Sequence, residues 1–143
     1  MEKGHEFIDH PADIQIHSWG KTLGLALESL GRGMFEVMFE LKGFNSLKEK
    51  HISVKGHDIH SMVYKFLDEW LFLFDTEDFV APTIVVKNVN LEDFSIEAVG
   101  YGEDFLMEKH HEYRRTEVKA ITYASMKVDI TSELTDIFVI LDL

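Results

Sequence analysis

The sequence predicts a single α+β domain, in which two helices pack on one side of a mainly antiparallel or mixed β-sheet. Two segments in the first half of the chain carry apolar residues at helical spacing, and the segments around them alternate as strands do. The chain has 143 residues, 45% of them hydrophobic, and no low-complexity stretch or linker. This length suits one domain and is enough to bury a sizeable core. We therefore expect residues 1–143 to form one domain.

The first strands are predicted close to the N-terminus. Residues 7–9 form a short apolar stretch typical of a strand end. Residues 13–19 alternate, with Ile14 and Ile16 on one face and polar residues on the other, which predicts a half-buried strand. Gly20 ends it.

Thr22 is suited to cap a helix that runs to about residue 40. Its apolar residues recur three or four positions apart: Leu23, Leu27, Leu30, Met34, Met38 and Leu41. Gly24, Gly31 and Gly33 each cost this helix roughly 1 kcal/mol relative to alanine. We therefore expect the helix to depend on tertiary packing, or to bear glycine where another backbone comes close.

Ile52 and Val54 predict a short strand, and Asp58 is suited to cap a second helix that runs to about residue 74. The apolar residues of this helix form one stripe: Ile59, Met62, Val63, Phe66, Leu67, Trp70 and Leu71. The rest of the chain favours strands at residues 83–89, 94–101, 117–130 and 137–141. A polar loop is expected over residues 103–116.

Composition excludes several classes of protein. The chain has no cysteine, which excludes disulfides and thiolate zinc sites. Its formal net charge of −12 argues against nucleic-acid binding through the overall field, because phosphate contacts need Lys and Arg. No apolar run is long enough to cross a membrane and no signal peptide is visible. We expect an intracellular protein of the cytoplasm, the nucleus or both.

Known catalytic motifs are missing, and the one local basic spot lies in the polar loop. The chain has no Walker loop, GxGxxG, GxSxG or HExxH. His57 and His60 are the one close histidine pair at near-helical spacing, and zinc would need two further ligands, so a structural or solvated role is expected. His110 and His111, with Arg114 and Arg115, are expected at the surface of the polar loop. Solvation, contact with an acidic partner or phosphate, and contact with RNA are the alternatives for these four.

Two aspartates lie at the ends of predicted strands. Asp13 begins the strand at residues 13–19, and Asp142 follows the last strand. Carboxylate oxygens suit hard cations such as Ca²⁺ and Mg²⁺. If the last strand pairs beside the strand at residues 13–19, both carboxylates share one end of the sheet. The alternative is a cap or turn role for each aspartate.

Six segments together resemble one protein family in order and spacing. They are residues 10–13 (His-Pro-Ala-Asp), 19–23 (Trp-Gly-Lys-Thr-Leu), 66–71 (Phe-Leu-Asp-Glu-Trp-Leu), 100–103 (Gly-Tyr-Gly-Glu), 117–123 (Glu-Val-Lys-Ala-Ile-Thr-Tyr) and 139–143 (Val-Ile-Leu-Asp-Leu). With these segments the chain resembles archease, the accessory protein of the RtcB-type RNA ligase, in its eukaryotic-like form. Two positions depart from the family pattern: Pro11 stands where threonine is usual, and Leu143 where isoleucine or valine is usual.

The resemblance implies an accessory role without catalysis. Archease proteins promote guanylylation and multiple turnover of the ligase, which joins RNA ends in tRNA splicing with GTP and divalent metal. The resemblance implies a metal held by Asp13, Asp142 and a main-chain oxygen of Leu143, with Ca²⁺ in family crystals and Mg²⁺ or Mn²⁺ as alternatives. It also implies functional roles for Lys119 and His10. The expected partner is the ligase or its tRNA ligase complex, with RNA involved only indirectly.

Two other functions remain open from the residues. A small metal-dependent phosphoester hydrolase would use the same carboxylates, with His10 as the base. A plain interaction module would use the acidic cluster only for structure. Turnover of a phosphoester by the isolated protein would indicate the hydrolase. Binding to the ligase that survives both metal chelation and loss of the aspartates would indicate the interaction module.

Overall fold

The computed structural model describes residues 2–9 and 12–143, and its strands lie in two antiparallel sheets. The larger sheet runs in the order β1 (Lys3–Asp9), β2 (Asp13–Gly20), β8 (Thr135–Asp142) and β6 (Ala120–Ile121), with β7 (Lys127–Ile130) also paired to β8. The smaller sheet runs in the order β3 (Lys48–Lys55), β5 (Ser95–Asp104) and β4 (Phe79–Asn90).

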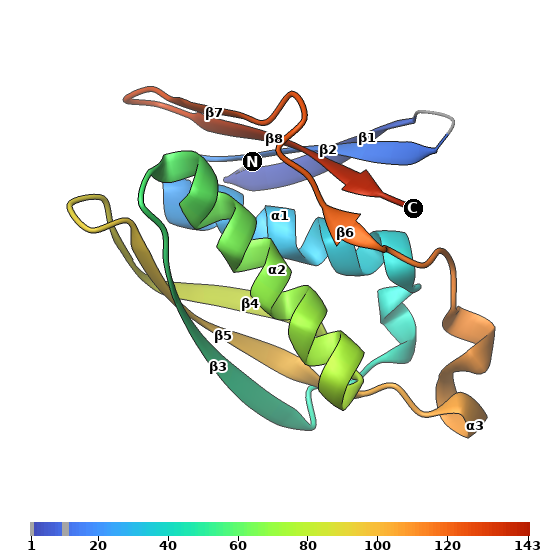
Figure 1. Ribbon diagram of the computed structural model, residues 1–143. Coiled ribbons are helices and arrows are strands. Elements are labelled where there is room, and N and C mark those ends of the chain that lie inside the picture. Colours follow the sequence, from blue (N-terminus) through green and yellow to red (C-terminus); the bar gives the residue numbers. More distant parts are fainter. Residues whose placement is uncertain (1, 10–11) are drawn as a thin grey trace.

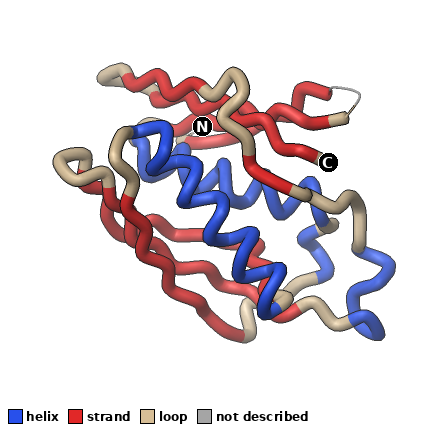
Figure 2. Tube along the Cα trace, viewed as in Figure 1, coloured by secondary structure: helices blue, strands red, loops and turns tan. Residues whose placement is uncertain are grey.

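The two long helices form a layer between these sheets (Figure 1). They are α1 (Leu23–Met38) and α2 (Ile59–Glu77), and a short α3 (Met107–His110) and two 3₁₀ turns, η1 (Leu41–Gly43) and η2 (His111–Tyr113), complete the helical elements of the described residues (Figure 2). The predicted α+β class with antiparallel strands is confirmed. The strands divide between two sheets, so the helices are covered on both sides.

Helix α1 is buried on nearly all sides because a sheet packs on each side of it. It packs against β2 on one side and β4 on the other. Its glycines serve this double contact, because a Cβ at Gly31 would meet the Ile84 side chain at 2.5 Å, and one at Gly33 would meet the side chains of His5 and Ile16 at 3.2 and 3.3 Å. The glycines therefore admit side chains of the two sheets rather than a neighbouring backbone.

The sequence signals for the starts of the two long helices are confirmed. The Thr22 hydroxyl accepts a hydrogen bond from the Leu25 N–H, and α1 begins at the next residue after Thr22. The Asp58 carboxylate accepts from the Ser61 N–H at 2.7 Å while the Ser61 hydroxyl accepts from the Asp58 N–H, a capping box. Helix α2 ends at Glu77, and the φ of 62° at its C-cap Asp78 is left-handed.

The predicted continuous strand over residues 117–130 is wrong. The segment forms two short strands, β6 and β7, that pair with opposite ends of β8. Ile121 and Lys127 are six positions apart in the sequence, whereas their partners on β8, Leu141 and Phe138, are three apart. The additional residues between β6 and β7 must therefore form a loop. The polar loop expected at residues 103–116 is also partly ordered, because it contains α3 and η2.

No helix among the described residues is both long and apolar enough to span a membrane.

Candidate functional site

The ends of β2 and β8 bring the two predicted aspartates together. In the antiparallel register, Asp13 lies directly opposite Asp142. Burial alternates along both strands, and Ile14 and Leu141 face the helices. Asp13 and Asp142 therefore face the outer side of the larger sheet, half-buried and exposed respectively. The predicted pairing of the last strand beside the strand at residues 13–19 is confirmed, and Figure 1 shows the end of β8 beside the start of β2.

Main-chain hydrogen bonds tie three segments together at this point. The Leu143 N–H donates to the Ala12 carbonyl at 3.3 Å, and the Lys119 N–H donates to the Asp142 carbonyl at 2.8 Å. Lys119 has an exposed side chain and directly precedes β6. The structure thus places Asp13, Asp142, Leu143 and Lys119 side by side, although 106 or more residues separate the first from the others in the sequence. His10 lies outside the described residues.

The donors at this site are oxygen atoms, and that chemistry suits a hard cation. Like charges directly opposite one another on neighbouring strands destabilise a sheet, so the pairing of Asp13 with Asp142 has a cost that a bound cation would offset. Among the described residues, no group of three or more histidine, aspartate or glutamate side chains is arranged to hold a metal. Two carboxylates with a main-chain oxygen of Leu143 would leave most of a six- to eight-fold Ca²⁺ shell to water or a partner.

Arg115 has a structural function beside the site. Its N–H donates to the Met38 carbonyl at 2.8 Å, and its guanidinium donates to the Glu36 carbonyl at 3.1 Å. The Thr116 N–H donates to the Val37 carbonyl at 3.2 Å. These bonds satisfy the carbonyls at the C-terminal end of α1 and place a cation at the negative end of its dipole. Segment 114–118 is therefore anchored to α1 before it reaches Lys119.

The expected surface position is correct for His111 and Arg114 and wrong for His110. His111 and Arg114 are exposed, and the Arg114 guanidinium lies 5.2 Å from the centroid of the Phe105 ring. The His110 side chain is 0% exposed, because its ring stacks on Phe44 and its Nδ1 accepts from the Leu106 N–H at 2.9 Å. The His110 side chain therefore belongs to the interior and not to the surface of the loop.

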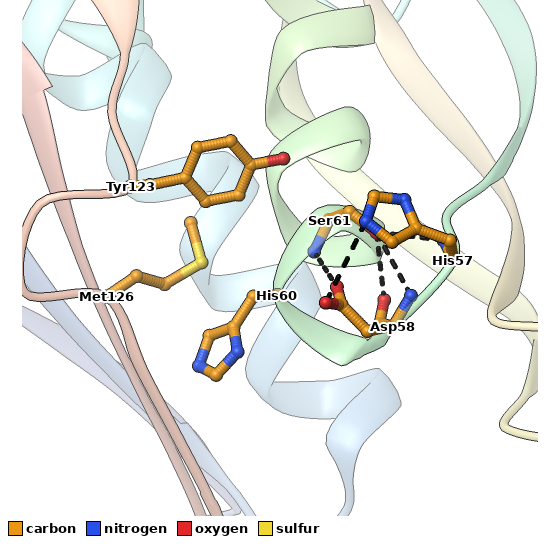
Figure 3. A pocket seen from close by; sticks show the side chains of 6 residues that line it. All are labelled: His57, Asp58, His60, Ser61, Tyr123 and Met126. Carbon is orange, nitrogen blue, oxygen red and sulfur yellow. Dashed lines mark hydrogen bonds and ion pairs between the residues drawn. The ribbon is translucent and has the colours of Figure 1, made fainter.

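The other histidine pair lines a shallow pocket at the start of α2. This pocket has a volume of about 350 Å³, and Tyr123 and Met126 form its opposite side. Figure 3 shows the rings of His57 and His60 pointing away from one another, with Asp58 turned back to cap the helix. The pair does not converge on a common point as zinc ligands would.

Sequence reasoning missed His17, which joins three strands on the outer side of the larger sheet. Its Nδ1 pairs with Glu6 of β1 at 2.6 Å, and its Nε2 pairs with Asp136 of β8 at 2.7 Å. The ring also stacks on Phe138, with the centroids 4.2 Å apart. Burial lowers the pKa of His17, but the hydrogen bonds and charges of the two carboxylates outweigh it and leave that pKa raised above 6.5.

His17 is expected to make stability depend on pH. Because its pKa is higher in the folded state, its contribution is fully present below 6.5 and is lost as pH rises through the folded-state pKa. The free energy of unfolding should therefore differ between wild type and His17→Gln by more at about pH 6 than at about pH 8.5. Urea unfolding at both pH values measures this. A difference that grows toward alkaline pH would contradict the assignment.

Comparison with known proteins gives one consistent family. The sequence model of the Archease protein family (MTH1598/TM1083) matches residues 5–143. Protein archease of Danio rerio is 40% identical over 144 positions, covering 100% of this chain and 87% of that protein. Protein archease of Pyrococcus furiosus is 37% identical over 126 positions, covering 87% of each chain.

Solved structures agree with the sequence comparison. The solution structure of Methanobacterium thermoautotrophicum protein 1598 has a TM-score of 0.79 and 33% identity, and the match covers 98% of this chain and 99% of that one. The crystal structure of an archease from Thermotoga maritima, described as a possible chaperone, has a TM-score of 0.64 at 17% identity and shares the fold; the match covers 95% of this chain and 94% of that one. Together with the family match over nearly the whole length, these findings show that the chain belongs to the archease family.

Proposed function

We propose that this chain is a non-catalytic accessory factor that binds a divalent cation and stimulates guanylylation and multiple turnover of an RtcB-type RNA ligase in tRNA splicing. Family membership supports the accessory role. The observation that carries the proposal is the pairing of Asp13 with Asp142, because it joins the distant residues that the family resemblance marks as metal ligands. The proposed setting is the cytoplasm, the nucleus or both.

The chain's own residues have distinct tasks in this proposal. Asp13, Asp142 and a main-chain oxygen of Leu143 would hold the cation, and the bound ion would supply positive charge for phosphate oxygens. The Lys119 N–H fixes the Asp142 carbonyl at 2.8 Å, and the exposed Lys119 side chain adds a second cation at the same edge. Contacts made only with the guanylylation-ready conformation of the ligase would shift its population toward that state.

Charge favours the encounter between the two proteins. The chain carries a formal net charge of −12, and a ligase cleft that binds GTP and RNA requires basic residues. Opposed potentials raise association rates and disfavour direct binding of the accessory protein to RNA. RNA therefore enters this account through the ligase alone.

A multiple-turnover ligation assay tests the proposal. Purified ligase is supplied with GTP, divalent metal and an excess of RNA ends, with and without this chain. We expect several rounds of joining with the chain and about one round without it. Equal product in both reactions would overturn the accessory role, and release of phosphate by the isolated chain would favour a hydrolase instead.

A further inference from the structure

A groove with an apolar floor lies between the C-terminal halves of α1 and α2 and segment 114–118. Its volume is about 430 Å³, which is enough for one or two large side chains. Met38, Phe39 and Val118 form the floor and are 4%, 3% and 4% exposed. Phe74 of α2 is half-buried on one wall. The groove therefore has an apolar floor of which little is exposed, within a largely polar lining.

Two carboxylates from different elements stand on the rim of this groove. Asp75 belongs to α2 and Glu117 to segment 114–118, and both are exposed. Within the described residues, neither makes an ion pair. Burial raises the pKa of Asp75, and the charges of Glu117 and Asp68 raise it further. The fold thus holds these carboxylates close enough for their charges to repel.

The two arginines on the rim already have contacts within the chain. Arg115 donates to the Glu36 carbonyl, and the Arg114 guanidinium lies over the Phe105 ring. Neither contact neutralises a guanidinium, so the lining of the groove holds two positive and two negative charges. The charges that act on Asp75 are those of Glu117 and Asp68, both negative, so this end of the groove favours a cationic group.

The groove lies close to Leu143, which with Asp13 and Asp142 forms the candidate metal site, here called the acidic site. Val118 on its floor directly precedes Lys119, whose N–H is bonded to the Asp142 carbonyl. Arg115 and Thr116 line both this groove and a second hollow of about 330 Å³ that reaches Leu143. The groove is therefore near one of the three residues of the acidic site.

We propose that the groove docks a segment of the partner protein in which a large apolar side chain is flanked by lysine or arginine. The apolar side chain enters between Phe74 and Val118, and the cation lies between Asp75 and Glu117. The inference rests on the proposed function, because the partner is the RNA ligase that the acidic site serves. It adds a docking surface of stated chemistry, separate from the residues that hold the metal.

The affinity of the chain for purified ligase, measured by calorimetry with Ca²⁺ present, tests this surface. The Asp75→Asn/Glu117→Gln double variant keeps the shape of the rim and removes both charges. We expect it to bind about tenfold more weakly and with a smaller salt dependence. Its melting temperature should equal or exceed that of wild type, because neutral side chains remove the repulsion that raises the pKa of Asp75.

A matched control is the Glu108→Gln/Glu112→Gln double variant, which removes two exposed charges from the neighbouring segment that contains α3 and η2. We expect less than about a twofold change in its affinity. An equal loss in the control, or a loss accompanied by a lower melting temperature in the groove variant, would overturn the inference. So would RNA binding by the chain alone that Arg114→Ala abolishes.

Different results would contradict the docking proposal for the groove and the proposed function. Wild-type affinity in the groove variant, with stimulation still lost in Asp13→Asn, would overturn the groove and leave the accessory function standing. No binding and no stimulation by the wild-type chain would overturn both.

Discussion

The Asp142→Asn variant is expected to bind Ca²⁺ at least about tenfold more weakly than the wild-type chain, and Asp13→Asn is expected to do the same. Each carboxylate supplies both an oxygen ligand and a negative charge, and the register places one directly opposite the other. Losing either leaves a single side-chain carboxylate and a main-chain oxygen. Isothermal titration with Ca²⁺ measures the loss.

Stability should change in the opposite direction when no metal is present. In a chelating buffer, the two carboxylates repel each other across the strand pair, so Asp142→Asn should melt at the wild-type temperature or above it. Added Ca²⁺ should raise the melting temperature of wild type and leave that of the variant nearly unchanged. Asp129→Asn, at an exposed position on β7 opposite Asp136, is the control because it also removes one of two opposed charges. It should melt at the wild-type temperature or above it in chelating buffer, and added Ca²⁺ should raise its melting temperature as much as that of wild type. Equal Ca²⁺ affinity in all three proteins would contradict the proposal that Asp13 and Asp142 bind the metal.

Extending the chain beyond Leu143 is the second change with a large expected effect. Leu143 is half-buried, and its N–H is bonded to the Ala12 carbonyl, so its main-chain oxygens are held next to Asp13 and Asp142. Residues added after Leu143 would crowd the coordination shell around its main-chain oxygen. We expect Ca²⁺ affinity to fall by about tenfold or more.

Calorimetry on chains with and without a short glycine-serine extension measures this effect. A matched chain with the same extension before residue 1 controls for the added residues. Identical affinities in the extended and unextended proteins would show that Leu143 contributes no ligand, and would leave the two aspartates as the only candidates within the described residues.

Features encoded by short stretches of sequence could be predicted. Thr22 and Asp58 were each expected to precede a helix, and both cap one by hydrogen bonding to the first turn. The spacing of apolar residues located α1 and α2, because a helix repeats its buried face within one or two turns. Apolar and polar residues alternate over residues 13–19, as in a half-buried strand, and these residues form most of β2.

Features that depend on distant partners could not be predicted from local patterns. The break between β6 and β7 follows from the register that each has with β8, and no residue within 117–130 encodes that register alone. His110 is buried because Phe44, which precedes β3 in the sequence, stacks on its ring. His17 gains its second carboxylate from Asp136, 119 positions away in the sequence.

The candidate site lies between these cases. Residue spacing gave only a conditional expectation that the last strand would pair beside the strand at residues 13–19, and the family resemblance connected Asp13 with Asp142 and Leu143. The structure confirms the proximity of these residues. Their action on a metal and on the ligase stays a prediction, as does the role of Lys119.

The measurement that bears most directly on the central claim is guanylylation of the ligase with labelled GTP, with wild type, Asp13→Asn or Asp129→Asn added in equal amounts. If the paired carboxylates act on the ligase, wild type and Asp129→Asn will both accelerate labelling, and Asp13→Asn will leave it at the rate of the ligase alone. Full acceleration by Asp13→Asn, from a protein shown by calorimetry to have lost its metal, would contradict the account.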